Sequence, residues 1–255
     1  MIANYHSHTT RCHHAKGTEA EFVVKALERG LKIFGFSDHT PQYFPGDYYS
    51  FMRMHPHELD GYCDTVRQLQ KDYAGQIQIP LGVEVEYYPA TWKELLPRLR
   101  DAGIEYLIMG QHWIGNEENE PYVGAATADE SILKRYCYQA MEGLDTGAFT
   151  YLAHPDVINF VGDRNIYRRH MKDLIRFARQ AGVPLELNLL GLRSHRHYPT
   201  PDFWALAAEE GCQVILGMDA HEPFHIQETE TEGRALEIVR QLGLELLDTV
   251  ELKPL

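Results

Sequence analysis

Short apolar runs alternate with amphipathic stretches along the whole chain. The apolar runs predict strands near 2–5, 32–36, 77–83, 104–109, 150–153, 184–188 and 213–217. The amphipathic stretches predict helices near 18–30, 57–74, 91–101, 129–145, 165–181, 201–210 and 231–242. Thr18 is placed to cap the first helix, with Glu21 three residues on and Gly30 at its end. Strands separated by helices predict a parallel sheet with right-handed crossovers, and therefore an α/β fold.

Histidines and acids follow nearly every predicted strand at the same point. They are His6 with His8, His39, Glu84, His112, His154, and Asp219 with His221. An open doubly wound sheet gathers its ligand residues at one switch point. Their recurrence around the chain favours a barrel instead, because a barrel brings the carboxyl ends of all its strands to one rim. We therefore predict a distorted, TIM-barrel-like (β/α)7 barrel with a metal site at that rim.

Length and charge narrow the class of protein. The 255 residues fit one barrel domain over 1–255, with no visible linker. The formal net charge of −13 and the lack of a basic block disfavour a nucleic-acid partner or an anionic membrane. The four cysteines are far apart, without a CxxC pair, which indicates reduced thiols. No signal peptide and no apolar run of about 20 residues is visible, so we expect a cytoplasmic protein; the oligomeric state is not predicted.

The donor set indicates which metals the site holds. Imidazoles and carboxylates without a thiolate suit Zn²⁺, Mn²⁺ or Fe²⁺ and argue against Cu(I) or a structural cysteine–zinc site. His13 or His14 adds one more imidazole, and spacing alone does not separate the two. At three or four ligands per ion, the set suffices for two or three divalent ions. Such a cluster holds a bridging hydroxide and polarises a phosphoryl oxygen, which favours hydrolysis of a small phosphoester.

The motifs around these residues resemble a known family. They read HSHTTRCHHAKGT, IFGFSDHTP, LGVEVEYYP, MGQHWIG, LAHPDVINF, ELNLLGLR and GMDAH, and they span residues 6–221. In this order they resemble the polymerase and histidinol phosphatase (PHP) superfamily, and more narrowly its single-domain histidinol-phosphatase branch. The resemblance implies a phosphomonoesterase that hydrolyses L-histidinol phosphate by a metal-bound hydroxide, late in histidine biosynthesis. Gln111 and the segment 116–128 depart from the family pattern, which bears on substrate choice.

The resemblance also implies three ligand sets. The first is His6, His8, Glu84 and Asp219; the second is Glu84, His112 and His154; the third is His14, His39 and His221. The family's spacing after HxH favours His14 over His13. Glu84, Asp219 and His221 are the expected catalytic residues, with Glu84 bridging two ions.

Substrate contacts are expected from loops that follow the strands. Arg193 is the first choice for a two-point phosphate contact, because a planar guanidinium suits a dianionic phosphate. Arg164 is a second choice, and His197 is a candidate proton donor to the leaving group. Asp38 is interpreted either as a partner that orients a ligand histidine or as an ordinary turn acid. Glu86 points to the same face as Glu84 by the period of two, or is a solvated carboxylate.

Three other functions compete with this interpretation. A nuclease is disfavoured by the acidic charge, although a short oligonucleotide stays open as a substrate. An amidohydrolase also begins with HxH, but the pattern typical of that class has a bridging lysine after a middle strand, where this chain has Glu84. A metal-buffering or regulatory protein with a dead site is the non-enzymatic alternative, and any phosphoester turnover would exclude it.

Overall fold

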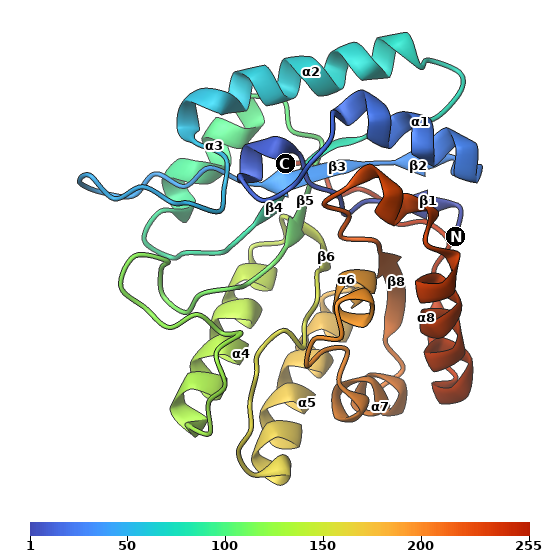
Figure 1. Cartoon of the computed structure of the whole chain (residues 1–255). Coiled ribbons are helices and arrows are strands. Elements are labelled where there is room, and N and C mark those ends of the chain that lie inside the picture. The colour runs from blue at the N-terminus through green and yellow to red at the C-terminus, as the bar shows by residue number, and fades with distance from the viewer.

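The computed structural model describes all residues, 1–255. Its strands are β1 (Ala3–Asn4), β2 (Ile33–Phe34), β3 (Phe36–His39), β4 (Leu81–Val85), β5 (Tyr106–Met109), β6 (Phe149–Leu152), β7 (Leu185–Asn188), β8 (Gln213–Gly217) and β9 (Glu245–Leu246). Its α-helices are α1 (Glu19–Arg29), α2 (Leu59–Asp72), α3 (Trp92–Asp101), α4 (Glu130–Asp145), α5 (Arg164–Gln180), α6 (Leu189–Arg193), α7 (Pro201–Glu209) and α8 (Thr229–Leu242). The helices lie outside the strands (Figure 1). None of them has the length and apolar character needed to cross a membrane.

The strands form an irregular, parallel barrel. β3 to β9 make a seven-stranded sheet in sequence order, and β1 pairs with β2 in a separate two-stranded sheet. The chain after β1 joins the two ends of the arrangement. Ser37 N donates to Ser7 O at 2.9 Å on one side, and His8 N donates to Ala220 O at 2.9 Å on the other. The rim is therefore closed by the segment that carries His6 and His8.

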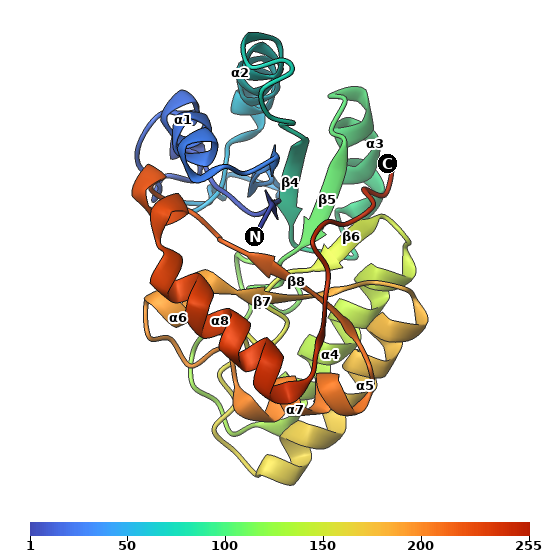
Figure 2. The same ribbon diagram turned by 90° about the vertical axis from the view of Figure 1, so that its right-hand side faces the viewer.

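The other end of the barrel is covered by the end of the chain. β9 pairs with the first residues of β8, and Lys253 N donates to Thr150 Oγ1 at 3.2 Å. The last residues cross in front of β8 and reach β5 and β6 (Figure 2). This leaves the carboxyl ends of the strands as the functional face.

Inside the barrel, Tyr106 fills the space beneath that face. Its side chain is fully buried, and its hydroxyl donates to Tyr5 O at 2.7 Å. A Cβ at Gly35 or Gly82 would lie 2.4 Å or 2.3 Å from Tyr106 atoms, so both positions need glycine for packing space. The interior is therefore a packed core, as in other barrels of this kind, and not a pore.

The predicted elements are confirmed. Each predicted strand and helix is present within a few residues of its expected bounds, and Thr18 with Glu21 forms the predicted capping box. α6 and β9 were not predicted, since five- and two-residue elements are too short to show a period. Outside the strands, apolar helix faces pack on the sheet; α5 buries Tyr167, Met171 and Leu174 at helical spacing. Each such side chain contributes about 1.5–3 kcal/mol when fully buried.

Candidate metal centre

Neighbouring strand ends deliver the first ligand candidates. His6 and His8 follow β1, His39 is the last residue of β3, and Glu84 lies near the end of β4. β3 and β4 pair in a register that sets His39 beside Glu84. All four residues are buried. Parallel pairing thus places side chains far apart in sequence within one group.

The remaining strand ends complete the ring. His112 follows β5, His154 follows β6, and Asp219 and His221 follow β8. His154 and Asp219 take left-handed backbone conformations, with φ of 28° and 47°. Such conformations are costly for residues other than glycine and persist where the surrounding structure imposes them, often at functional sites.

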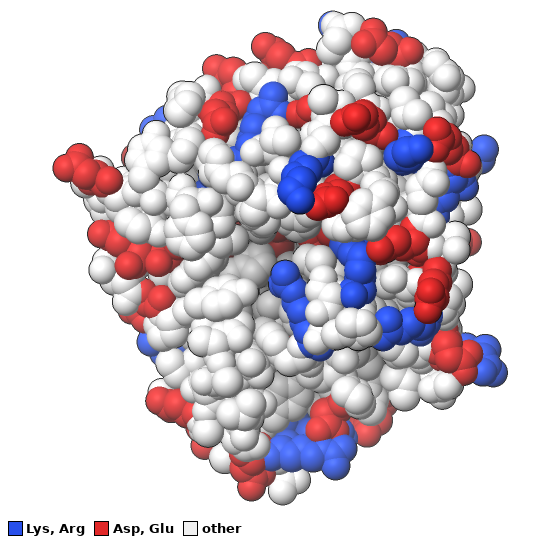
Figure 3. Space-filling view, viewed as in Figure 1, with Lys and Arg blue, Asp and Glu red and all other residues white.

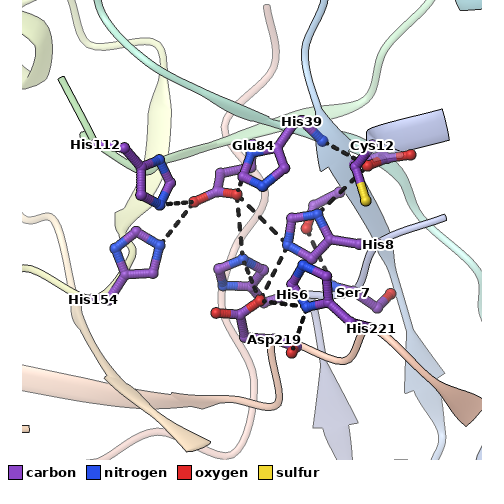
Figure 4. Close-up of polar contacts among 12 residues, drawn as sticks. His6, Ser7, His8, Cys12, His39, Glu84, His112, His154, Asp219 and His221 are labelled. Atoms are coloured by element: carbon purple, nitrogen blue, oxygen red, sulfur yellow. Dashed lines mark hydrogen bonds and ion pairs between the residues drawn. The ribbon is translucent and has the colours of Figure 1, made fainter. Parts of the chain in front are cut away.

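Glu84 lies at the centre of the group (Figure 4). Its Oε2 is 2.9 Å from His39 Nδ1, and its Oε1 is 2.8 Å from His154 Nε2. His6 Nε2 and His8 Nε2 each lie 3.6 Å from Oε2. One carboxylate therefore faces imidazoles on both sides, which is the arrangement expected of a bridging ligand.

Asp219 organises the other part of the group. Its Oδ1 is 3.1 Å from His8 Nε2, 3.6 Å from His6 Nε2 and 3.3 Å from His221 Nδ1. His14, His39 and His221 each offer a ring nitrogen within 4.8 Å of the others. His13 is turned away and packs on His55, with ring centroids 4.7 Å apart. Of the two neighbours, His14 is thus the one that reaches the cluster.

Several buried polar atoms that converge within this group have no hydrogen-bond partner in the protein. His6 Nε2, His8 Nε2, Glu84 Oε2 and Asp219 Oδ1 accept or donate no hydrogen bond. Buried polar atoms are almost always paired, so a converging set of unpaired ones requires an explanation. Imidazole nitrogens and carboxylate oxygens are common ligands of Zn²⁺ and similar divalent ions. The residues present therefore fit a metal centre.

The electrostatics keep both carboxylates charged. Burial alone would raise the pKa of Glu84 and of Asp219, but the surrounding histidines outweigh it and hold both well below their usual values. Burial also lowers the pKa of His39 and of His221, with the help of the charge on His8. Ionised carboxylates and neutral imidazoles are the forms in which these side chains bind metal ions.

Three ligand histidines have acidic partners on their other ring nitrogen. His6 Nδ1 is 2.7 Å from Glu186 Oε2, His112 Nδ1 is 3.3 Å from Glu86 Oε1, and His8 Nδ1 is 3.4 Å from Asp38 Oδ1. Such contacts fix the ring orientation and make the imidazole a stronger ligand. Glu86 thus has an orienting geometry, whereas Asp38, for which the sequence suggested that role, lies near His8 Nδ1 without forming a hydrogen bond to it.

A cavity of about 290 Å³ opens onto the metal centre. Its lining residues are His14, His39, Met52, Glu84, His112, Tyr122, His154, Leu190, Arg196, Tyr198, Asp219 and His221. Figure 3 shows a hollow in this face with acidic atoms deep inside and basic side chains along one side. Arg196 Nη1 lies 3.1 Å from the hydroxyl of Tyr198, so the guanidinium is held at the cavity wall.

The expected substrate contacts lie elsewhere. Arg193 is close to the centre but is turned to the backbone, with Nη2 3.2 Å from Asp219 O and Nη1 3.2 Å from Glu228 Oε2. Arg164 is exposed and forms an ion pair with Asp202. His197 Nε2 lies 2.6 Å from Val157 O, and it lines a second cavity together with Arg164. None of these three side chains lines the metal cavity.

Some site residues were not predicted from the sequence. Glu186 carried a signal, since an acid within the apolar run of β7 lies on the same face as Asn188. Asn188, by contrast, was considered from the sequence either as a pocket residue or as a cap at the strand end; it caps α6 and also donates to Asp219 Oδ2 at 3.0 Å. Arg196, Tyr122 and Met52 come from loops and carry no periodic signal.

Comparison with known proteins identifies the family. The profile described as PHP domain matches residues 4–189. A Deinococcus radiodurans protein named "Probable histidinol-phosphatase" is 32% identical over 231 residues, which is 87% of each chain. A Schizosaccharomyces pombe protein of the same name is 24% identical over 258 residues, covering 89% of this chain and 82% of that one.

A solved structure is similar over nearly the full length. Histidinol phosphate phosphatase from Lactococcus lactis, complexed with zinc, L-histidinol and phosphate, has a TM-score of 0.76 and 19% identity and covers 98% of this chain and 97% of its own. This likeness confirms the predicted fold class, a distorted TIM-barrel-like α/β fold. The profile match covers well over half of the chain and begins before the first ligand pair. The chain belongs to the PHP domain family.

Proposed function

We propose that this chain, as one barrel domain over residues 1–255, is a metal-dependent phosphomonoesterase that converts L-histidinol phosphate and water to L-histidinol and phosphate. The observation that carries the proposal is the set of unpartnered donor atoms of His6, His8, Glu84 and Asp219 beneath a cavity that Arg196 lines. The names of the relatives and the L-histidinol in the Lactococcus lactis complex support the substrate. Histidine biosynthesis in the cytoplasm is the role that follows from this substrate.

The residues of the centre divide into three sets. His6, His8, Glu84 and Asp219 would hold one ion, Glu84 with His112 and His154 a second, and His14, His39 and His221 a third. Bound Zn²⁺, Mn²⁺ or Fe²⁺ would supply a Lewis acid for the phosphoryl oxygens and a water of lowered pKa.

The protein's own groups position the substrate. Arg196 is the proposed phosphate contact, because its guanidinium lies at the cavity wall while that of Arg193 is engaged by Glu228 and Asp219 O. A guanidinium there neutralises charge that develops on the phosphoryl oxygens during in-line displacement. Tyr122, Met52 and Leu190 supply the apolar part of the wall and exclude water around the leaving group.

Phosphate release by the reconstituted protein tests the proposal. The protein is loaded with Mn²⁺ or Zn²⁺ and assayed with L-histidinol phosphate, p-nitrophenyl phosphate, a nucleoside monophosphate and a short single-stranded oligonucleotide. We expect kcat/KM of at least about 10⁴ M⁻¹s⁻¹ for L-histidinol phosphate, well above the other substrates. The chelator-treated protein is the control. Equal rates on L-histidinol phosphate and p-nitrophenyl phosphate would refute the proposal that L-histidinol phosphate is the substrate. A preference for the oligonucleotide would instead support a nuclease.

A further inference from the structure

A buried arginine joins three parts of the functional face. Arg53 is only 1% exposed, although it lies in a long loop, 40–56. Its Nε is 2.6 Å from Glu117 Oε2, and its Nη2 is 2.7 Å from Glu86 Oε1. Its Nη1 also donates to Thr40 O at 3.3 Å. The guanidinium thus connects its own loop to the end of β4 and to the loop 113–128.

The group is a buried ionic network of one cation and two carboxylates. The hydroxyl of Tyr48 donates to Glu117 Oε1 at 3.0 Å, which uses the remaining oxygen of that carboxylate. A buried ion pair contributes little to net stability when intact, but removing one partner is costly because the other is left uncompensated. The contact therefore fixes geometry more than it stabilises the fold.

The two loops depend on such contacts for their shape. Between β3 and the short 3-10 helix Pro56–Glu58, and between Trp113 and residue 128, the backbone forms no helix or strand. Apart from isolated β-bridges such as Trp113 with Tyr122, the second loop forms no β-sheet pairing with the rest of the protein. Side-chain contacts between the loops accordingly set where each one lies.

Both loops contribute to the cavity wall. Met52, directly before Arg53, and Tyr122, five residues after Glu117, line the cavity over the metal centre. Neither residue belongs to the ligand sets. If the phosphate end of a phosphoester meets the metal centre, the wall that these loops form is placed to face its organic part.

We propose that Arg53 and Glu117 are a positioning pair that holds loops 40–56 and 113–128 together as a preformed wall for the leaving group. This inference rests on the proposed function, since it concerns how the same cavity selects its substrate. Glu117 acts on substrate binding through Met52 and Tyr122, and it contacts no residue of the ligand sets.

Glu117→Ala in the full-length, metal-loaded protein tests the pair. Removing Glu117 leaves Arg53 paired with Glu86, whereas removing Arg53 would leave two buried carboxylates without their cation and would also affect His112 through Glu86. Glu118→Ala is the matched control, because Glu118 is the exposed neighbour in the same loop. We expect KM for L-histidinol phosphate to rise roughly tenfold with kcat within about twofold, the pattern of lost uniform binding. Glu117→Gln, which keeps the shape and an acceptor for Arg53, should recover most of the affinity.

Two further measurements separate positioning from a general structural effect. The inhibition constant of inorganic phosphate and the bound metal should match the wild type in Glu117→Ala. Hydrogen exchange should accelerate in both loops in Glu117→Ala and in neither in Glu118→Ala. An unchanged KM, an equal loss of phosphate and metal binding, or an unchanged rate of hydrogen exchange in the two loops would each refute the proposed role of the pair. If the wild type does not hydrolyse L-histidinol phosphate, the proposed function fails, while hydrogen exchange still decides whether the pair holds the loops.

Discussion

Gly110 offers a way to displace the central carboxylate without removing any ligand. It follows β5, and the side chain of Glu84 fills the space that a side chain at 110 would need. A Cβ built at this position would lie 1.7 Å from Glu84 Oε1, 2.5 Å from Cδ and 2.8 Å from Cγ. Gly110 does not have a left-handed φ, so alanine fits the backbone there. Gly110→Ala therefore acts through space alone.

The geometry gives the size of the effect. To reach an ordinary contact of 3.4 Å, Glu84 Oε1 must move about 1.7 Å from the new methyl group. That movement breaks its 2.8 Å contact with His154 and shifts Oε2 from its 2.9 Å contact with His39. A misplacement of about 1 Å in a reacting group costs roughly 100-fold, or about 2.7 kcal/mol in the barrier. We expect kcat/KM to fall by at least about 100-fold.

Phosphate release, bound metal and thermal unfolding are measured together. Overpacking costs about 1–3 kcal/mol, so Gly110→Ala should still fold. Gly61→Ala is the matched control, since Gly61 lies inside α2 and a Cβ added there would have nothing within 4 Å. It should keep full activity and gain up to about 1 kcal/mol of helix stability. If Gly110→Ala keeps kcat/KM within about threefold of the wild type, the central role of Glu84 is wrong.

Two further predictions concern the phosphate contact and the protons of the centre. Arg196→Ala should raise the inhibition constant of inorganic phosphate at least about tenfold, as expected for a lost charge-assisted contact, whereas Arg193→Ala should chiefly lower the thermal unfolding temperature; the reverse order would return the phosphate to Arg193. In the metal-free protein, burial alone would lower the pKa of His8. Its contacts with Asp219 and Asp38 outweigh burial and raise the pKa to about 9. The stabilisation from protonated His8 is thus complete below pH 6.5 and is lost as pH rises towards 9, while metal affinity rises over the same window. Calorimetry in buffers of different ionisation enthalpy should detect proton release on metal binding near pH 7, and its absence would contradict the assignment of His8.

The clustering of the candidate ligand residues was predictable, because the order of the strands in a parallel barrel follows their order in the sequence. Once alternating strands and helices indicate a parallel barrel, residues at or just after the carboxyl end of each strand lie at the same rim. His39 and Glu84 illustrate this, since a strand register alone brings them together. No knowledge of loops was needed to group them. The same reasoning could have included Glu186, because the period of two along β7 sets it beside Asn188.

The choice between two nearby arginines was not predictable. Arg193 is the last residue of α6, and Arg196 follows His195, which has a left-handed φ of 50°. That single turn reverses the direction of the chain, so one guanidinium meets backbone carbonyl groups while the other faces the cavity. A five-residue helix and a non-glycine left-handed residue leave no pattern in the sequence. Arg53 and Glu117 were hidden for the same reason, because loops carry no period.

The acids around the centre explain why its histidines take opposite protonation states. Burial lowers the pKa of His6, but Glu186, Asp219 and Glu84 outweigh it and raise it well above its usual value. His39 and His221 are also buried, yet the charge on His8 helps to hold their pKa values well below the usual one. Without metal, protons on His6 and His8 therefore balance the buried carboxylates, and His39 and His221 stay neutral. Bound divalent ions would replace these protons in neutralising the carboxylates. The same buried negative charge that holds the protons in the metal-free protein therefore attracts the metal ions.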